Sequence, residues 1–485
     1  MLIRSRGKQE ASIGNMNKKL IRKEESTMFK KTLALLLAAL MVMGMLAGCG
    51  NSQPTATDAA NQTTQNAETT EAAATEAEAE KPSGTLTWLT NSAYGDVPQS
   101  LADAYMEYNP NAQVVIEAYT RTELMKVIDI KIGAGDAGYD VLFVDQPLVA
   151  SYFWKDYLLP LDDYFTEDEL SVFTKADLGS GYVEDSLQAV PLTSSSQVLM
   201  VNQDLLKEAG LSLDASVLDL SDRLTWEQLV DLATQFQEKM DPDHSKGYWG
   251  FVFGQQSNAY QILALGNSLG EKAIADDGVT VEGVLNTEGW EKALGFYQDL
   301  YTKYEVSPVG STDDEVKSLF YSGKILFYVA NTIRAAAADF NIAGVLHPYF
   351  EGGQVTVPTG SWYLGINKNS QNVDLAVDFL HFCTTGEGAE LWMLNNNQVP
   401  ARVDLLANIT EGKYDAFTQW PGYATTIAAM ENLAGVGYAR PTSYGWGSFD
   451  TIFSNMLADL RSGADVKTSL DAAAAQLQAD FNQYK

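Results

Sequence analysis

The sequence predicts a mixed α/β fold in which mostly parallel sheets are flanked by helices and divided between two lobes. Strand-like and helix-like runs alternate from residue 85 onward, and this alternation is typical of parallel sheets. The chain of 485 residues is longer than one hydrophobic core usually serves, which favours two lobes. Polar residues at 193–196 separate two strand-like runs, as expected where the chain crosses from one lobe to the other.

The N-terminal segment has the features of an export signal. Lys30 and Lys31 precede an apolar run at 33–45, which is too short for a relaxed membrane span. A signal peptide of ordinary length would begin at Met28, and we expect this methionine to be the true start. Residues 1–48 are therefore assigned to the signal peptide and excluded from the fold.

The small residues that follow the apolar run end in a cysteine, in the segment Leu46-Ala47-Gly48-Cys49. This segment resembles the lipobox of bacterial lipoproteins, which implies that Cys49 is acylated on sulfur and becomes the first mature residue. A lipid would then anchor the protein at the extracellular face of a cell membrane, as in Gram-positive lipoproteins. The alternative is an ordinary signal peptide with a chance cysteine.

Residues 49–83 are expected to form a disordered acidic linker behind this cysteine. The stretch consists mainly of Thr, Ala, Gln, Asn and Glu, with almost no large apolar residue to offset the entropy cost of ordering. A flexible chain of this length spans about 30 Å. Such a linker would hold a folded body clear of the membrane.

Cysteine content and charge limit the classes of function. If Cys49 is acylated, Cys383 has no cysteine left for an intrachain disulfide, and it is expected to be a small buried apolar residue on a helix. The formal net charge of −31 disfavours nucleic acid as a partner, because that binding requires Lys and Arg to neutralise phosphates. The same charge disfavours contact of the folded body with an anionic membrane.

The first predicted strands end in polar residues. One strand is expected at 85–90 and a buried strand at 139–144, separated by a helix, a strand and a second helix. In open sheets, ligands bind beyond the carboxyl ends of the strands. The residues expected at these ends are Asn91, Ser92, Asp145 and Gln146.

The rest of the chain continues with strands and helices and contains a second apparent crossing at 359–366. Thr225 is expected to cap a helix. Trp88, Trp226 and Trp290 fall within apolar periodicity and are expected in the core. The further predicted elements are strands at 189–192, 198–202, 247–253 and 325–329 and helices at 258–268 and 288–304, followed by mostly helical sequence with a break at 439–447.

Several segments together resemble a known family, the extracellular solute-binding proteins, family 1, which serve carbohydrate ABC transporters. The resemblance covers nearly all of the chain after the linker and lies in the order and spacing of motifs that are individually weak. It implies a two-lobed periplasmic-binding-protein-like fold of type II, whose hinge-linked lobes close around a solute and present the closed shape to a permease. The matching segments are 133–141, 201–211, 224–229, 320–324, 365–370 and Arg440-Pro441.

Projected onto this chain, the resemblance implies two discontinuous lobes. Lobe one would comprise residues 84–193 and 361–385. Lobe two would comprise residues 196–358 and 388–485. The protein would be a monomer that does no covalent chemistry, and no cofactor or metal site is expected. Calcium is the one metal left open, because the chain has many acidic residues but no EF-hand loop.

One segment departs from the family pattern. Relatives often have Gly-Pro-Trp where this chain has Asn331-Thr332-Ile333-Arg334, so a common stacking tryptophan is missing. Either another aromatic residue replaces it, or the ligand is smaller or more polar than a long neutral oligosaccharide.

A sugar site needs planar aromatic rings for the faces of the sugar, and amides, carboxylates or Arg for its hydroxyls. Trp446, between two glycines, is the preferred stacking residue, with packing of a surface loop as the alternative. Other candidates also have an alternative to ligand contact. Trp249 could be a core residue, Asp145 could cap a helix, and Arg440 could form a structural ion pair. The ten candidate ligand-binding residues are Asn91, Ser92, Asp145, Gln146, Ser195, Trp249, Trp362, Arg440, Tyr444 and Trp446.

Motifs of enzymes are not found in the sequence. No acidic pair stands out as a glycosidase pair, and His244, His347 and His381 form no zinc-binding pattern. Nucleophile elbows and phosphate-binding glycine loops are also missing.

The favoured function is a lipid-anchored receptor that captures a sugar or oligosaccharide for an ABC transporter. Two rivals are a receptor of the same fold for a peptide, polyamine or other small polar solute, and a surface lipoprotein that degrades glycans.

Overall fold

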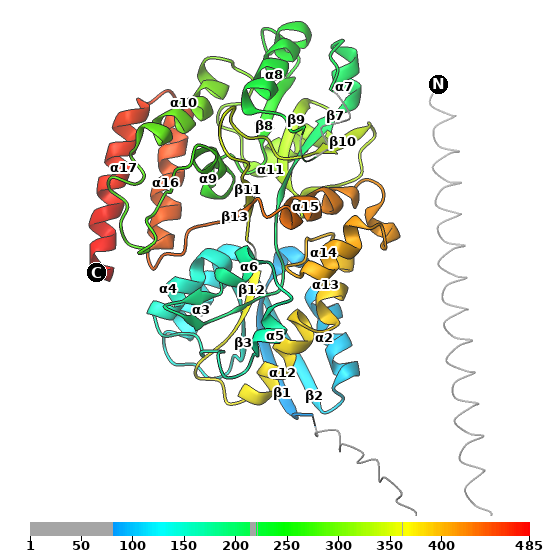
Figure 1. The fold of residues 1–485 in the computed structure, drawn as a ribbon, viewed down its shortest axis with the longest axis vertical. Coiled ribbons are helices and arrows are strands. Elements are labelled where there is room, and N and C mark those ends of the chain that lie inside the picture. The colour runs from blue at the N-terminus through cyan, green and yellow to red at the C-terminus, as the bar shows by residue number, and fades with distance from the viewer. Residues whose placement is uncertain (1–80, 214–219, 221, 361) are drawn as a thin grey trace, which may run out of the picture. The chain divides into compact units, whose positions relative to one another are not determined.

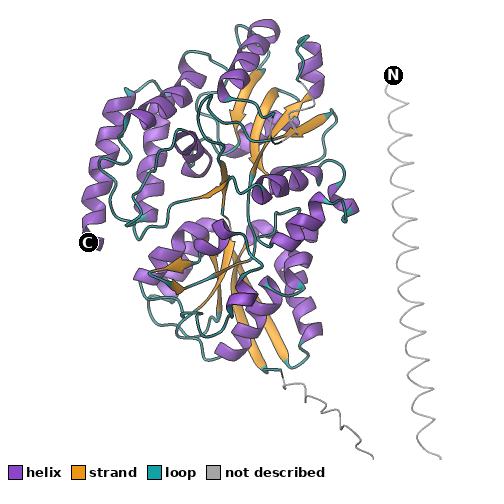
Figure 2. Cartoon of the chain, viewed as in Figure 1, coloured by secondary structure: helices purple, strands orange, loops and turns teal. Residues whose placement is uncertain are grey.

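The protein is described by a computed structural model over residues 81–213, 220, 222–360 and 362–485. The predictions for the signal peptide, for Cys49 and for most of the linker lie outside these residues. The described part is mixed α/β, with helices that flank two main sheets (Figure 1 and Figure 2). The predicted α/β class, with one sheet for each of two lobes, is confirmed.

The first sheet consists of β1 (Gly84–Asn91), β2 (Ala112–Tyr119), β3 (Val141–Asp145), β6 (Val190–Pro191) and β12 (Trp362–Ile366). Its strand order is β2-β1-β3-β12-β6. β1 pairs in parallel with β2 and with β3, whereas β12 runs antiparallel to β3 and to β6.

The second sheet consists of β7 (Gln197–Asn202), β8 (Trp249–Phe253), β9 (Ile325–Asn331) and β10 (Ile342–Val345), in the order β10-β7-β9-β8. Only β8 and β9 pair in parallel in this sheet. Each sheet therefore contains one strand that runs against the others, β12 in the first and β7 in the second, and the prediction of mostly parallel sheets is confirmed. A parallel pair requires a long crossover connection, whereas β7 and β12 each follow a short passage from the neighbourhood of the other sheet.

Helices cover these sheets and fill the space around them. Those before residue 200 are α2 (Val97–Tyr108), α3 (Arg121–Lys131), α4 (Val149–Trp154), α5 (Glu167–Leu170) and α6 (Lys175–Gly179). The later helices are α7 (Gln203–Glu208), α8 (Trp226–Met240), α9 (Ala259–Ser268), α10 (Glu288–Thr302), α11 (Asp313–Tyr321), α12 (Val373–Thr384), α13 (Gly388–Asn396), α14 (Val403–Thr410), α15 (Tyr423–Leu433), α16 (Trp446–Arg461) and α17 (Val466–Phe481).

Local sequence accounts for where several helices begin. Thr225 caps α8 through its side-chain oxygen and completes a capping box with Gln228, as predicted. Thr120 and Glu123 form the same arrangement at the start of α3. The three tryptophans that were expected in the core are fully buried. Cys383 is also buried on α12, as predicted, and burial raises the pKa of its thiol.

The chain segments that connect the two sheets, called passages below, run side by side. β11 (Val357–Thr359) and β13 (Gly437–Ala439) pair in parallel. The amide of Asn432 on α15 bonds two of these segments. Its Nδ2 donates to Ser196 Oγ at 2.7 Å, and its Oδ1 accepts from Ser194, on the same segment, at 3.3 Å and from Thr359 at 3.4 Å.

The lobe boundaries stay a prediction, and the packing of two helices refines it. α13 contacts α2 and α12 beside the first sheet, whereas α14 contacts α15, which in turn contacts β7 and β10. We infer that the last passage lies between these two helices, later in the chain than residues 385–388.

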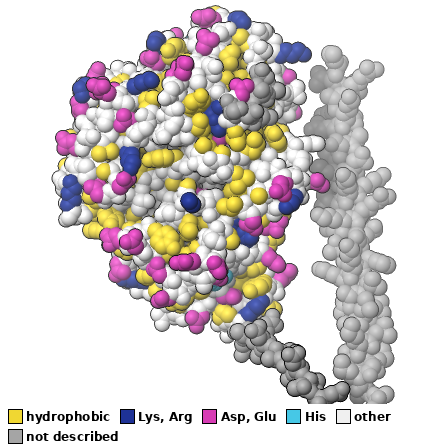
Figure 3. Space-filling view, viewed as in Figure 1, with side chains coloured by type: hydrophobic (Ala, Val, Ile, Leu, Met, Phe, Trp, Pro, Cys, Tyr) yellow, Lys and Arg dark blue, Asp and Glu magenta, His cyan; other side chains and the backbone are white. Residues whose placement is uncertain are grey.

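The surface carries charges of both signs. On the face in Figure 3, acidic side chains and Lys or Arg side chains are scattered among neutral ones. Among the residues that the structure describes, no helix combines the length and the apolar character needed to cross a membrane.

Candidate functional site

A pocket of about 110 Å³ lies where the two sheets face each other. Asp145 ends β3 and Trp362 begins its antiparallel neighbour β12, so the two are direct partners at one edge of the first sheet. Asn331 ends β9, and Gln255 follows the parallel strand β8. The pocket therefore lies beyond the carboxyl ends of strands in both sheets, as ligand sites of open α/β sheets do. Its lining residues are Tyr94, Arg121, Asp145, Ser195, Gln255, Asn258, Tyr260, Asn331, Ile333, Gly360, Trp362, Gln398 and Arg440.

Asp145 is held between two arginines. Arg440 donates from Nη2 to Asp145 Oδ1 at 2.6 Å, and Arg121 lies 2.8 Å from Oδ2 through its own Nη2. Burial alone would raise the pKa of Asp145, but Arg440 and Arg121 together lower it below its ordinary value. The carboxylate in turn raises the pKa of Arg121. The cluster is therefore fully charged near neutral pH.

Arg440 also contacts residues from several other elements. Its guanidinium lies over the ring of Tyr260, 4.8 Å from the centroid. Its backbone oxygen accepts from Gln146 Nε2 at 3.0 Å. Tyr260 shares a hydrogen bond of 2.5 Å with Ser195, and burial raises the pKa of the tyrosine. Gly360 has a φ of 82°, a left-handed conformation that glycine adopts without strain.

Trp362 supplies a planar aromatic surface. One face of its indole stacks on Phe143, with centroids 4.6 Å apart and planes inclined by 5°. Tyr94 meets the indole edge-on at 6.4 Å. Trp362 is 9% exposed and lines the pocket, so the face opposite Phe143 is the one open to a ligand.

Several buried polar atoms at this pocket lack a hydrogen-bond partner within the described part of the chain. They include the side-chain oxygens of Gln255 and Asn331 and the Nε of Arg440. Buried polar atoms are normally paired, so these three atoms are available to the polar groups of a ligand or to water. The described residues bring together no group of three His, Cys, Asp or Glu side chains that would hold a metal ion.

A model of the family described as bacterial extracellular solute-binding protein matches residues 47–390. The chain belongs to this family. The arrangement of its pocket, between two sheets and lined from both, agrees with that membership.

Known relatives of this solute-binding protein differ in what their names say they bind. The maltotriose-binding protein of Pyrococcus abyssi is 22% identical over 59% of this chain and 59% of its own length. The sn-glycerol-3-phosphate-binding periplasmic protein UgpB of Escherichia coli K12 is 24% identical over 52% of this chain and 58% of its own length. The match thus spans less than two thirds of each of these relatives.

A solved structure shows the same fold. The cyclic alpha-maltosyl-1,6-maltose binding protein of Arthrobacter globiformis superposes with a TM-score of 0.68 at 17% identity, over 83% of this chain and all of the other. At this level of identity the likeness concerns the fold and not the ligand.

The structure brings four of the ten predicted residues of this solute-binding protein into the pocket. They are Asp145, Ser195, Trp362 and Arg440. Gln146 lies beside them through its bond to Arg440. Their contact with a solute stays a prediction.

Two other predicted residues lie next to β1 without lining the pocket. Asn91 is buried, and its side chain accepts from the backbone N–H of Ala93 at 2.9 Å to cap the short 3-10 helix Ser92–Tyr94. Ser92 is exposed at the start of that helix. Tyr94, two residues further on, lines the pocket instead, because the helical turn directs it inward.

The three remaining aromatic candidates do not line this pocket. Trp249 begins β8, at the opposite end of the strand from the pocket, and stacks on His244 at 4.6 Å. Tyr444 donates to Glu184 at 2.7 Å and lines a separate pocket. Trp446 is 1% exposed and stacks on Phe449 at 5.1 Å. Trp446 is the first residue of α16, and its ring centroid lies 6.0 Å from the guanidinium of Arg440. Its burial favours a packing role, and its contact with a solute stays a prediction.

Several lining residues were not predicted. Gln255 and Asn258 belong to a polar run directly after a strand, which is the same signal that singled out Asp145. Asn331 ends its strand in the same way. Arg121 begins a helix, and nothing in its sequence context indicates that it turns towards Asp145.

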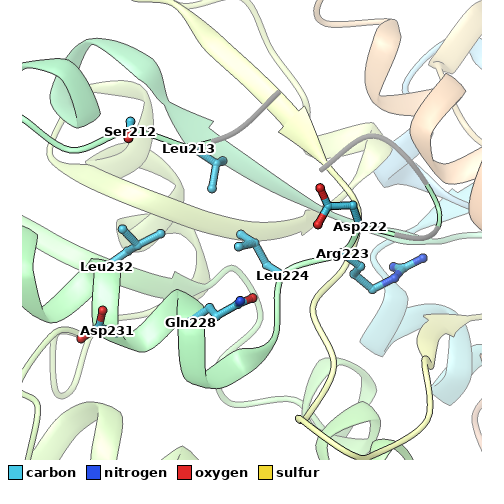
Figure 4. Close-up of a pocket in the computed structure, with 8 residues that line it drawn as sticks. All are labelled: Ser212, Leu213, Asp222, Arg223, Leu224, Gln228, Asp231 and Leu232. Carbon is cyan, nitrogen blue, oxygen red and sulfur yellow. The ribbon is translucent and has the colours of Figure 1, made fainter. Parts of the chain in front are cut away.

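A larger pocket, of about 360 Å³, lies beside α8 (Figure 4). Arg223 extends away from Gln228 and Leu232 in this view. Its two terminal nitrogens instead bond the carboxylate of Glu431 at 2.6 and 2.7 Å. Among the described lining residues of this pocket the one cationic group is therefore already paired, and the pocket fits a solute less well than the pocket at Asp145.

Proposed function

We propose that this chain is a lipid-anchored extracellular receptor that captures a sugar or oligosaccharide and delivers it to the permease of an ABC transporter. The observation that carries the proposal is the pocket between the two sheets. It offers one open indole face, two amide side chains and an Arg–Asp pair, which are the groups that sugar recognition requires.

Hinge closure would couple binding to transport. The pocket is lined by Trp362 and Asp145 from the first sheet and by Asn331 from the second. A solute that touches both sheets stabilises the arrangement in which they are close, so it shifts the population towards the closed form. Closure of this kind is a known mode of binding proteins. No covalent step is part of the proposed mechanism.

The relatives support the carbohydrate class. One bears the name maltotriose-binding protein, and another with the same fold is named for a cyclic maltosyl-maltose. The proposed anchor rests on the lipobox-like segment that ends at Cys49 and on the polar stretch behind it. More than one acyl chain on that cysteine would hold the protein stably, since a single chain binds a membrane only marginally.

A second candidate ligand is a small polar solute that carries a phosphate. Two observations favour it: Arg121 and Arg440 both reach the pocket, and one relative is named for sn-glycerol 3-phosphate. The receptor role is the same in this alternative, and the chemistry of the ligand differs.

Isothermal titration calorimetry of the full chain against sugars, sugar alcohols, phosphate esters, dipeptides and polyamines tests the proposal. We expect binding of at least one carbohydrate. Binding of a dipeptide or a polyamine, with no heat from any carbohydrate, would overturn the carbohydrate assignment. Release of shorter products from an oligosaccharide would instead indicate a glycan-degrading enzyme.

A further inference from the structure

We propose that the pocket takes a single electrically neutral monosaccharide or polyol unit, and that it disfavours both phosphate esters and longer oligosaccharides. This inference rests on the proposed receptor function and narrows its ligand. Three features carry it: the unpartnered polar atoms, the balance of charges and the number of open aromatic faces.

The unpartnered atoms fit hydroxyl groups. Gln255 Oε1 and Asn331 Oδ1 are acceptors and Arg440 Nε is a donor, and all three are buried without partners within the described residues. A hydroxyl both donates and accepts, so it satisfies either kind of atom, and it suits an amide in either of its two orientations. A phosphate dianion only accepts, and it would meet the two amide oxygens unfavourably.

The charges of the pocket are already balanced. Asp145 binds Arg440 and Arg121 at 2.6 and 2.8 Å, and Asp450 on α16 lies 3.8 Å from Arg121. Two cations and two carboxylates thus form one neutral cluster. An anionic ligand could accept from the unpartnered Nε of Arg440, but it would add a negative charge beside a cluster whose two arginines are already matched by two carboxylates. A neutral ligand has no such cost.

The aromatic surfaces provide room for one ring. Phe143 covers one face of Trp362, and the guanidinium of Arg440 covers a face of Tyr260. Ile333, which is 40% exposed, adds an aliphatic and not an aromatic surface to the lining. The volume of about 110 Å³ is also well below the range of about 300 to 1,000 Å³ for drug-sized ligands. Within the described lining no second indole is available to stack the second and third rings of an oligosaccharide, and the volume is too small to hold them.

Calorimetry with matched ligands tests this inference. The probes are a panel of hexoses, pentoses and pentitols, together with the 6-phosphate of glucose, sn-glycerol 3-phosphate, maltose and maltotriose. We expect some uncharged monomer to bind at least tenfold more tightly than every phosphate ester and than maltotriose. Tighter binding of maltotriose or of a phosphate ester would overturn the inference and leave the receptor function standing. Binding of no carbohydrate of any size would overturn both.

Amide variants test the hydroxyl contacts. Gln255→Ala and Asn331→Ala should each weaken binding of the preferred monomer by about tenfold, because each removes one buried hydrogen bond. Neither should lower the melting temperature of the ligand-free protein, since the oxygens that are lost have no partner there. Gln235→Ala, on α8 and outside the pocket, is the matched control and should not change the Kd. Unchanged affinity in both pocket variants would overturn the assignment.

A gain of aromatic surface provides the converse test. Ile333→Trp adds a second indole at the pocket and should improve the affinity for maltose relative to the monomer by about fivefold or more. Ile130→Trp, at a residue that is 69% exposed on α3 and far from the lining, is the control and should leave this ratio unchanged. A ratio unaffected by Ile333→Trp would show that aromatic faces do not set the size limit, against the inference.

Discussion

Arg440 Nη2 donates to Asp145 Oδ1 at 2.6 Å and so joins the segment before α16 to the carboxyl end of β3. The two residues are separated by 295 positions in the chain. Their pairing brings a passage between the sheets into contact with the pocket. In the proposed mechanism, a solute at Asp145 would therefore act directly on this passage.

Asp145→Asn is expected to lower both affinity and stability. The change leaves Arg440 without its counter-charge and Arg121 with only Asp450, at 3.8 Å, and loss of one partner of a buried pair costs about 3 kcal/mol. Urea denaturation of the variant checks this value. Because the arginines lower the pKa of Asp145, its stabilising effect is present above the unfolded pKa of about 4 and is lost as the pH falls below it.

A surface pair provides the control for this prediction. Asp129 bonds Lys155 at 2.7 Å with both side chains partly exposed. Asp129→Asn should therefore cost less than about 1 kcal/mol. Equal losses in the two variants would contradict the special role of the buried cluster.

Trp446→Ala and Trp362→Ala should separate a core residue from a pocket residue. Trp446 is packed on Phe449 and is almost fully buried, so its truncation should cost about 3 to 5 kcal/mol in the free energy of unfolding. Trp362→Ala should in addition weaken solute binding by more than its loss of stability explains. The measurements are chemical denaturation and calorimetric titration on the same preparations. A stable Trp446 variant that binds poorly would restore Trp446 as a ligand contact.

Some of this site could be predicted from the sequence because strand ends are local signals. Asp145 follows an apolar run directly, and it lies at the pocket where the strand ends. Arg121 reaches the same carboxylate from a helix start, and its approach depends on how β2 and β3 lie across the sheet. A contact of this kind leaves no local sequence pattern from which it could be predicted.

Trp446 shows how a local signal can mislead. Its flanking glycines suggested a loop, yet α16 begins at this residue, and Trp446, Phe449 and Phe453 share one buried helix face. The strand directions show the same limit of local patterns. Most strands of each sheet run in parallel, as predicted, but the reversed directions of β7 and β12 are decided by the connections from the other sheet, which a local pattern does not reveal.

Asn432→Ala is expected to loosen the passages between the sheets. Its amide bonds Ser194 and Ser196 on one passage and Thr359 on another, and all these groups are buried. Loss of the amide removes the partner of Ser196 Oγ at 2.7 Å, while Ser194 and Thr359 still bond each other, and should cost about 1 to 3 kcal/mol. Denaturation measures the loss, and Asn395→Ala on the exposed side of α13 is the control. A loss no larger than that of the control would contradict this role.

Asp177 is expected to make stability fall as the pH rises. Its side chain is buried, and burial raises its pKa to about 7 even though Thr174 donates to it. A carboxyl whose folded pKa is raised binds its proton more tightly in the native state, so stability decreases between about pH 4 and pH 7. Asp177→Asn should flatten this slope and add about 2 to 4 kcal/mol at pH 8. Thermal unfolding from pH 4.5 to 8 checks the change, with Asp163→Asn at an exposed carboxylate as control. An unaltered slope would contradict the prediction.

Cys49→Ala tests the anchor. If the thiol carries the lipid, the variant should be found in the culture medium, whereas the unaltered protein stays with the cell membrane. Cys383→Ala is the matched control, because Cys383 is buried in the folded body and its loss should leave the protein on the cell. Fractionation followed by immunoblotting measures both. Because the linker separates Cys49 from the pocket, the released variant should also bind the solute with unchanged affinity. A Cys49→Ala variant that remained on the cell would contradict lipid attachment at this residue.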